Sequence, residues 1–162
     1  MITLKPATPA DIPFIVAAEQ HDDITPYIIP WAQQEHRHSF EDADIQYFMV
    51  MRSADGATVG YVILAGLKDI HDSIEFQRLV ITEQGQGYGN ATMAYVKRYA
   101  FTELNAHRLW LDVKEHNTRA RRLYEKHGFI VEGTLRECLK VNDQYQSLVV
   151  MSLLKNEYLA QV

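Results

Sequence analysis

The segment Gln84-Gly85-Gln86-Gly87-Tyr88-Gly89-Asn90 joins an apolar run, Leu79-Val80-Ile81, to a long segment with helical periodicity. This order predicts a strand that ends beside the N-terminus of a helix. Glycine tolerates positive φ and lets the backbone approach a ligand closely. The free N–H groups of the first helical turn and the positive end of the helix dipole favour an anion. The loop therefore indicates a phosphate-binding turn, although a tight connection alone would also explain it.

Common nucleotide-binding motifs fit this loop poorly. A Walker A loop ends in Gly-Lys-Ser or Gly-Lys-Thr, whereas this loop ends in Tyr88-Gly89-Asn90. A dinucleotide fingerprint belongs to the first βα turn of its domain, with an acidic residue about 20 positions further on. Asp112 has a suitable spacing, but only one more βα unit follows the loop. A doubly wound dinucleotide-binding sheet is therefore disfavoured.

Composition limits the class of protein. With 162 residues, 47% hydrophobic and 23% charged, the chain has the size and balance of one globular domain, residues 1–162. A net charge of -5 disfavours nucleic acid or an anionic membrane as the main partner. The single cysteine, Cys138, excludes a disulfide framework, and we expect a cytoplasmic protein. Because no apolar run approaches about 18 residues, we expect no membrane span.

The periodicity before the loop predicts two helices and three strands. Thr8-Pro9-Ala10-Asp11 is typical of a capped helix start, and Asp55-Gly56 is typical of a hairpin turn. The expected elements are a strand at 2–4, a helix over 9–19, an irregular aromatic stretch over 26–31, a short helix capped by Ser39, and strands over 47–52 and 59–64.

The second half reads as two βα units followed by a hairpin. We expect a strand over 74–81, then the glycine loop and a helix that buries Met93, Val96, Ala100 and Leu104. A strand over 109–113, a helix from Asn117 that ends at Gly128, and strands hinged on Asn142-Asp143 complete the chain. The pattern predicts a mixed α/β fold.

The two βα units should place both helix N-termini at one edge of the sheet. Asn117 and Tyr124 are seven residues apart, almost two helical turns, so they project from the same helix face. Asn117 could bond an amide-containing ligand while Tyr124 reaches a reacting centre. The alternative is that Asn117 is only an N-cap and Tyr124 only a core aromatic residue.

These residues carry a family resemblance. Gln84-x-x-Gly87-x-Gly89, followed by Asn117-x-x-Ala120-x-x-Leu123-Tyr124-x-x-x-Gly128-Phe129, resembles the paired motifs of the GNAT superfamily of acyl-CoA-dependent N-acetyltransferases. The similarity spans about 73–154, and Glu132-Gly133-Thr134-Leu135-Arg136 is similar to the branch with ribosomal-protein N-terminal and spermidine acetyltransferases. Residues before 73 match in layout only, so the acceptor stays open.

The resemblance implies a twisted mixed sheet, splayed near its middle, that binds acetyl-CoA. The pantetheine arm would follow the backbone of Leu79, Val80 and Ile81, and the pyrophosphate would lie on the loop. The residues given to the loop site are Gln84, Gly85, Gln86, Gly87, Tyr88, Gly89 and Asn90. Asn117 would face the pantetheine. Arg122, from the basic group Arg119, Arg121 and Arg122, would contact the adenosine phosphates, although such a group is often a solvated helix face.

The resemblance and the chemistry together suggest two catalytic residues. Thioester aminolysis releases a basic thiolate, and the Tyr124 phenol can protonate it while staying neutral at pH 7. Glu75 matches a position where relatives carry a carboxylate, and it could take the proton of the acceptor amine. The alternative for Glu75 is an acidic residue that faces solvent.

Other chemically suggestive residues receive structural interpretations or minor roles. Tyr27 and Trp31 are predicted to line the acceptor entrance, with burial in the core as the alternative. His36 and His38 are expected to be surface residues, and no metal site is predicted. His127 is expected to be a packed histidine.

The sequence thus predicts an enzyme that moves an acetyl group from acetyl-CoA to a primary amine by direct attack. A protein N-terminus, a polyamine and another small amine remain open as acceptors, and a homo-oligomer is compatible with the sequence. A non-catalytic acyl-CoA-binding sensor and a nucleotide-binding protein unrelated to CoA are the alternatives.

Overall fold

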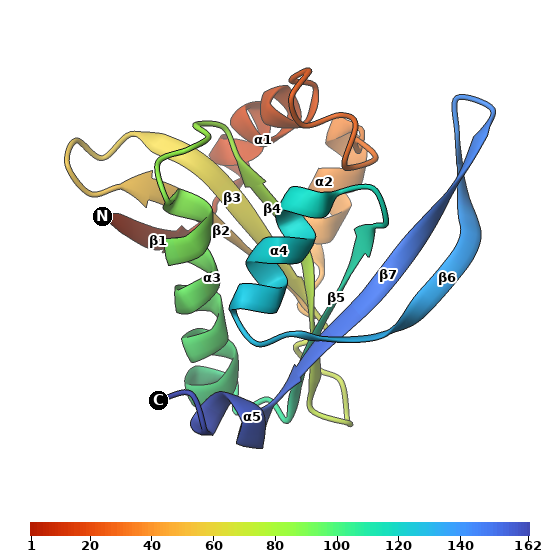
Figure 1. Cartoon of the computed structure of the whole chain (residues 1–162). Helices are drawn as coiled ribbons and strands as arrows, with labels where there is room; N and C mark the ends of the chain where they lie inside the picture. Colours follow the sequence, from red (N-terminus) through yellow and green to blue (C-terminus); the bar gives the residue numbers. More distant parts are fainter.

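The computed structural model describes residues 1–162 and contains one seven-stranded sheet with the order β1-β2-β3-β4-β5-β7-β6 (Figure 1). Only β4 and β5 are parallel, and every other neighbouring pair is antiparallel. The strands are β1 (Ile2–Pro6), β2 (Ile45–Arg52), β3 (Thr58–Ala65), β4 (Ser73–Ile81), β5 (Arg108–Lys114), β6 (Ile130–Val141) and β7 (Gln144–Leu154). The predicted mixed α/β class is confirmed.

Helices cover both faces of this sheet (Figure 1). They are η1 (Pro9–Asp11), α1 (Ile12–Glu19), α2 (Gln33–Glu41), α3 (Tyr88–Arg98), η2 (Tyr99–Glu103), α4 (Thr118–Lys126) and α5 (Lys155–Leu159). The larger buried cluster joins α3 and α4 to the sheet through residues such as Met93 and Leu111. A smaller cluster joins α1 to the opposite face through residues such as Ile15 and Tyr61.

The prediction of a helix that starts at Ser39 is wrong. Helix α2 spans Gln33–Glu41, so Ser39 lies in its last turns. The helix begins just after Pro30 and Trp31, where the backbone N–H of Ala32 donates to the Glu35 side chain at 3.1 Å. An acidic side chain at the third helical position satisfies the free N–H at the helix start, and this signal outweighs that of Ser39.

The other expected elements are present with small changes at their ends. The helix predicted over 9–19 consists of a 3₁₀ turn and α1. The helix after the glycine loop continues as a π-helical turn, η2, and buries Met93, Val96 and Ala100 as expected, whereas Leu104 is only partly buried. Asn142 and Asp143 form the predicted hairpin turn with φ values of 51° and 62°. Helix α5 was not predicted.

The sheet splays between β4 and β5. These strands pair only from Ser73 to Glu75, opposite Arg108 to Trp110. Next to the last bridge, the pairing of β4 with β3 shifts register, and Gln77 is left without a partner on β3. A bulge of this kind bends a strand and raises its twist. The rest of β4 therefore diverges from β5, and its edge toward β5 carries no strand.

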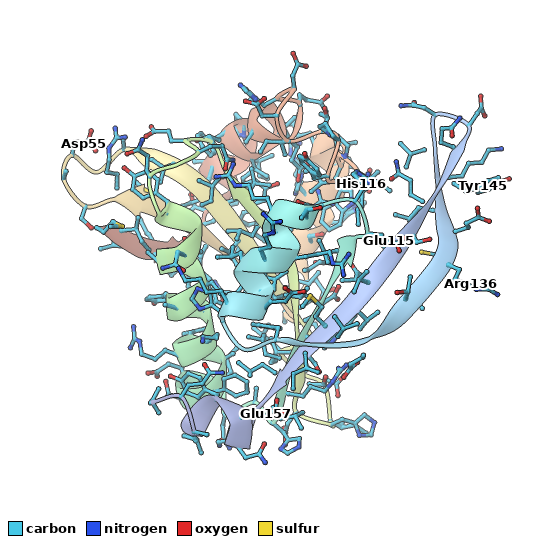
Figure 2. All side chains as sticks on the ribbon, viewed as in Figure 1. Asp55, Glu115, His116, Arg136, Tyr145 and Glu157 are labelled. Carbon is cyan, nitrogen blue, oxygen red and sulfur yellow. The ribbon has the colours of Figure 1, made fainter.

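The hairpin of β6 and β7 reaches beyond the body of the molecule, with Arg136 about midway along β6 and Tyr145 toward the far end (Figure 2). Nearly all of β6 is exposed. None of the helices has the length and apolar character that a membrane crossing requires.

Candidate active site

A cavity of about 950 Å³ occupies the splay between β4 and β5. Most of the predicted site residues line it, namely Tyr27, Trp31, Leu79, Ile81, Gln84, Gly85, Gly87, Tyr88, Gly89, Asn90, Asn117 and Tyr124. Four predicted residues do not line it: Glu75, Val80, Gln86 and Arg122. The two helix starts and the segment before α2 thus converge on one space, although they lie far apart in the sequence.

The glycine loop has the backbone that its sequence predicts. Gly85 and Gly87 adopt φ values of 77° and 80°, which side-chain-bearing residues rarely adopt. Gly87 is the N-cap of α3, and the Gln84 side chain donates to the carbonyl of Ile81 at 2.6 Å, which holds the loop against the strand end. The first N–H groups of α3 have no partner within the helix. They therefore offer donors to an anion.

Three polar features beside this loop match a ligand that carries amide groups. The β4 edge beyond Glu75 has backbone groups that no strand pairs. The Gln77 Oε1 atom is buried without a hydrogen-bond partner in a residue that lines the cavity. Asn117 accepts a hydrogen bond from the Ala120 backbone at 3.2 Å through Oδ1, which leaves its amide nitrogen free. The residues present therefore fit the pantetheine and pyrophosphate of a CoA molecule.

Tyr124 lies on the wall of the cavity, on the same helix as the Asn117 cap. Its side chain is buried, with the Phe76 ring edge-on at 6.4 Å and the Phe129 ring at 6.0 Å. Burial raises the pKa of Tyr124, and the nearby Asp112 charge raises it further. The phenol is therefore neutral at pH 7 and is able to donate a proton. The cap interpretation of Asn117 is correct, and both residues also face the cavity.

Glu75 is the last residue of β4 that is bridged to β5. Burial raises the pKa of Glu75, and the charge of Asp112 adds to this effect. Sequence reasoning missed Asp112 as a site residue, although it lines the cavity. The alternation of Leu109, Leu111 and Val113 places Asp112 on the face opposite the core, but it does not show that this face opens into a cavity.

The expectation that His36 is a surface residue is wrong. Its side chain is fully buried, and Nε2 lies 2.8 Å from Glu19 Oε1 while Nδ1 lies 2.7 Å from the Tyr47 hydroxyl. Glu19 is buried as well and also accepts hydrogen bonds from the Tyr61 hydroxyl and the Trp31 backbone. Burial alone would raise the pKa of Glu19, but these hydrogen bonds outweigh it and lower the pKa to about 2. His38 is exposed as expected.

Arg78 connects this buried group to the cavity wall. Its guanidinium donates to Glu19 at 2.6 Å and to the carbonyl of Ile29 at 2.9 Å. The same group stacks over the Trp31 ring at 4.3 Å from the centroid. Ile29 and Trp31 line the cavity, so Arg78 fixes the position of this wall and is itself neutralised by Glu19.

The other end of the same segment is attached to β5. The Lys114 ammonium donates to the carbonyl of Pro26 at 3.3 Å, and His116 Nε2 lies 3.2 Å from the same oxygen. The Tyr27 and His116 rings are 5.8 Å apart. His116 and Glu115 lie at the turn that leads into α4 (Figure 2). Residues 24–31 therefore connect β4 to β5 across the space where the two strands diverge.

Basic and histidine residues near the helix starts have different environments. Arg119 lines the cavity, whereas Arg122 is exposed outside it. His127 Nε2 lies 2.9 Å from Asn90 Oδ1 and joins α4 to the start of α3. Burial and the charges of Lys97 and Lys126 lower the pKa of His127 to about 4, so it is neutral at pH 7. No group of three or more His, Cys, Asp or Glu residues is arranged to hold a metal ion.

The sequence and the fold match known proteins. The family model described as an acetyltransferase (GNAT) domain matches residues 1–130. The chain belongs to the GNAT acetyltransferase family. It is 30% identical to the spermidine N(1)-acetyltransferase of Vibrio cholerae serotype O1 over 170 residues, which covers 98% of this chain and 95% of that protein.

Solved structures of the spermidine N-acetyltransferase from Vibrio cholerae have the same fold. Its complex with CoA and spermine superposes with a TM-score of 0.87 at 29% identity, covering 98% of each chain. A dodecameric structure of that enzyme gives a TM-score of 0.83 at 29% identity, covering 99% of this chain and 97% of that one. The present GNAT protein is an acetyl-CoA-dependent N-acetyltransferase that acts on an amine.

Proposed function

We propose that this acetyltransferase acetylates a polyamine such as spermidine. The observation that carries the proposal is the charge balance on the acceptor side of the cavity. Asp112 lines this side without any ion-pair partner, and the one ion-pair contact of Asp23 is with His21 at 3.7 Å. Of the basic side chains there, Arg78 is neutralised by Glu19, whereas Lys114 keeps its charge and donates to the Pro26 carbonyl.

The shape of the cavity supports the same acceptor. The Tyr27 and Trp31 rings line the cavity together with Asp23, and Trp31 already carries the Arg78 guanidinium over its ring, so aromatic rings contribute to a wall that suits a cation. A flexible chain with several positive charges matches a cavity that is lined by the Asp23 and Asp112 carboxylates and by aromatic rings. The likeness to spermidine acetyltransferases over nearly the whole chain agrees with this acceptor.

We assign the chemical roles as follows. The Gln84 to Asn90 loop and Asn117 hold acetyl-CoA, which supplies the acetyl thioester. Tyr124 gives its phenolic proton to the sulfur as the C–S bond breaks and the C–N bond forms. Glu75 takes the proton that the ammonium group must lose before attack, and because Glu75 does not line the cavity it acts through water or a neighbouring group.

We also propose a homo-oligomer of an acetyltransferase domain that spans residues 1–162 and works in the cytoplasm. The exposed Leu135 and Tyr145 side chains on the projecting hairpin favour self-association, and the dodecameric relative agrees with it. Light scattering coupled to gel filtration should give a mass several times that of one chain. A monomer at micromolar concentration would contradict this part.

The acceptor is tested by thiol release from acetyl-CoA with spermidine, butylamine and an N-terminal peptide. We expect kcat/KM for spermidine to exceed that for butylamine by about tenfold or more, because a second ammonium group adds a charged contact. A peptide preferred over spermidine would overturn the polyamine assignment. CoA binding without thiol release for any amine would instead indicate the non-catalytic sensor.

A further inference from the structure

Asp112 lies on β5 just beyond the point where β4 and β5 separate. Glu75 is paired with Trp110 across the last bridge between β4 and β5. Alternate residues of a strand share one face. Asp112 follows Trp110 by two residues on β5, so it lies on the same sheet face as Trp110 and its partner Glu75. Beyond this bridge no strand flanks β5 on its β4 side, so the Asp112 carboxylate opens into the cavity.

No cation neutralises either carboxylate. The seven ion pairs of the structure include neither Asp112 nor Glu75. Lys114 shares the strand face with Asp112, but its ammonium donates to the Pro26 carbonyl at 3.3 Å. A negative group in a partly desolvated cavity, with no countercharge of its own, is suited to bind a cation.

The charge of Asp112 acts on two other titratable groups near the splay, Glu75 and Tyr124. Burial raises the pKa of Asp112, and the Asp112 charge adds to burial in raising the pKa of Glu75. The same charge adds to burial in raising the pKa of Tyr124 on α4. Asp112 is therefore electrostatically coupled to the two residues with predicted catalytic roles, and it lies with Tyr124 on the cavity wall.

We propose that Asp112 is a further catalytic residue, the carboxylate that binds the ammonium group of the acceptor and takes its first proton, with Glu75 as the second member of the pair. The geometry gives this order, because Asp112 meets a molecule in the cavity and Glu75 does not. The inference rests on the proposed function for the positive charge of the acceptor.

The protons balance along this route. The ammonium group gives one proton to the Asp112 and Glu75 pair, which later releases it to water. The free amine forms the C–N bond, and the C–S electron pair passes to sulfur, which receives the Tyr124 proton. The second proton lost by nitrogen returns through water to the Tyr124 oxygen. The products are the acetamide, the CoA thiol and one proton.

The test compares two acceptors that differ in charge. Ethylamine is protonated at pH 7, whereas the fluorines of 2,2,2-trifluoroethylamine keep most of it neutral. Asp112→Asn should lower kcat/KM for ethylamine by about 10- to 100-fold, since a charged contact and a proton acceptor are lost. The same variant should lose much less with trifluoroethylamine, which has no proton to give before attack.

Controls separate this outcome from a damaged site. Asp112→Asn should bind CoA with unchanged affinity in calorimetry, and Asp143→Asn, in the hairpin turn, should match the wild type. Adding Glu75→Gln to Asp112→Asn should cost less than the product of the two single effects, because the pair acts together. Two results would overturn the proposal. One is that Asp112→Asn lowers kcat/KM equally for both amines, and the other is that Glu75→Gln lowers kcat/KM for ethylamine whereas Asp112→Asn does not. A preference for peptides over polyamines would refute the proposed acceptor, but it would not change how much more Asp112→Asn lowers kcat/KM for ethylamine than for trifluoroethylamine.

Discussion

The guanidinium of Arg78 lies 2.6 Å from the carboxylate of Glu19, and both side chains are withdrawn from solvent. This pair joins the end of α1 to the diverging part of β4. Arg78 also donates to the carbonyl of Ile29, so the pair holds the acceptor wall of the cavity in place. The contact therefore supports the fold and the site together.

Removing the Glu19 charge should destabilise the protein strongly. Glu19→Gln leaves Arg78 buried without its countercharge, and breaking a buried pair by removing one member typically costs about 3–5 kcal/mol. Chemical denaturation at pH 7 measures the change in the free energy of unfolding. Glu103→Gln, at an exposed position, should stay near the wild type. A loss for Glu19→Gln no larger than for this control would show that the pair contributes little.

The Glu19 carboxylate, with its hydrogen bonds from His36 and Tyr61 and its ion pair with Arg78, predicts a loss of stability in acid. The pKa of Glu19 is lowered from an ordinary 4.5 to about 2 in the folded protein. Its contribution is therefore complete above pH 4.5 and is lost as the pH falls toward 2. The difference in unfolding free energy between wild type and Glu19→Gln should shrink over this range. His127, whose pKa is also lowered, weakens both proteins equally and cancels in the difference. A difference that stays constant down to the folded pKa would contradict the prediction.

Local signals made much of the fold predictable. The glycine loop, the alternation of Leu109, Leu111 and Val113, and the Asn142-Asp143 turn each report the conformation of a few neighbouring residues. The GNAT motifs carry the rest of the topology, including the splay. The error at Ser39 arose because two local capping signals competed and the one formed by Glu35 prevailed.

The missed parts of the site depend on contacts between distant segments. Glu19 ends an apolar helix, and no local pattern shows that Arg78 and His36 reach it from β4 and α2. Asp112 was noticed only for its spacing from the glycine loop. Its meaning depends on where β4 leaves β5, which follows from a bulge that periodicity does not reveal.

Gly89 provides a test of the loop that spares the fold. A Cβ atom at Gly89 would lie 3.7 Å from the Leu123 side chain, an ordinary contact, and its φ is not in the left-handed region. Gly89→Val should therefore fold normally, yet weaken CoA binding by about tenfold or more because the added methyl groups occupy the cavity. Gly133→Val, at an open position on β6, is the matched control. Equal CoA affinity of both variants in calorimetry would exclude the loop as the binding element.

Asn117 should show two separable effects. Its Oδ1 atom caps α4 by accepting from the Ala120 backbone, and Asn117→Ala should cost about 0.5–2 kcal/mol of stability. Asn117→Asp keeps an acceptor for the cap but lacks the amide donor, so it should retain stability and still weaken CoA binding. Thermal unfolding and calorimetry on both variants measure the two effects. Full CoA affinity in Asn117→Asp would leave Asn117 as a cap only.

The turnover of Tyr124→Phe tests the central claim most directly. The substitution keeps the ring between Phe76 and Phe129 and removes only the hydroxyl. Single-turnover thiol release with saturating acetyl-CoA and amine should be slower by about 10²–10⁴-fold, the usual effect of losing one positioned acid. CoA affinity should be nearly unchanged. A variant that binds CoA normally and releases thiol at the wild-type rate would contradict acetyl transfer with Tyr124 as the acid.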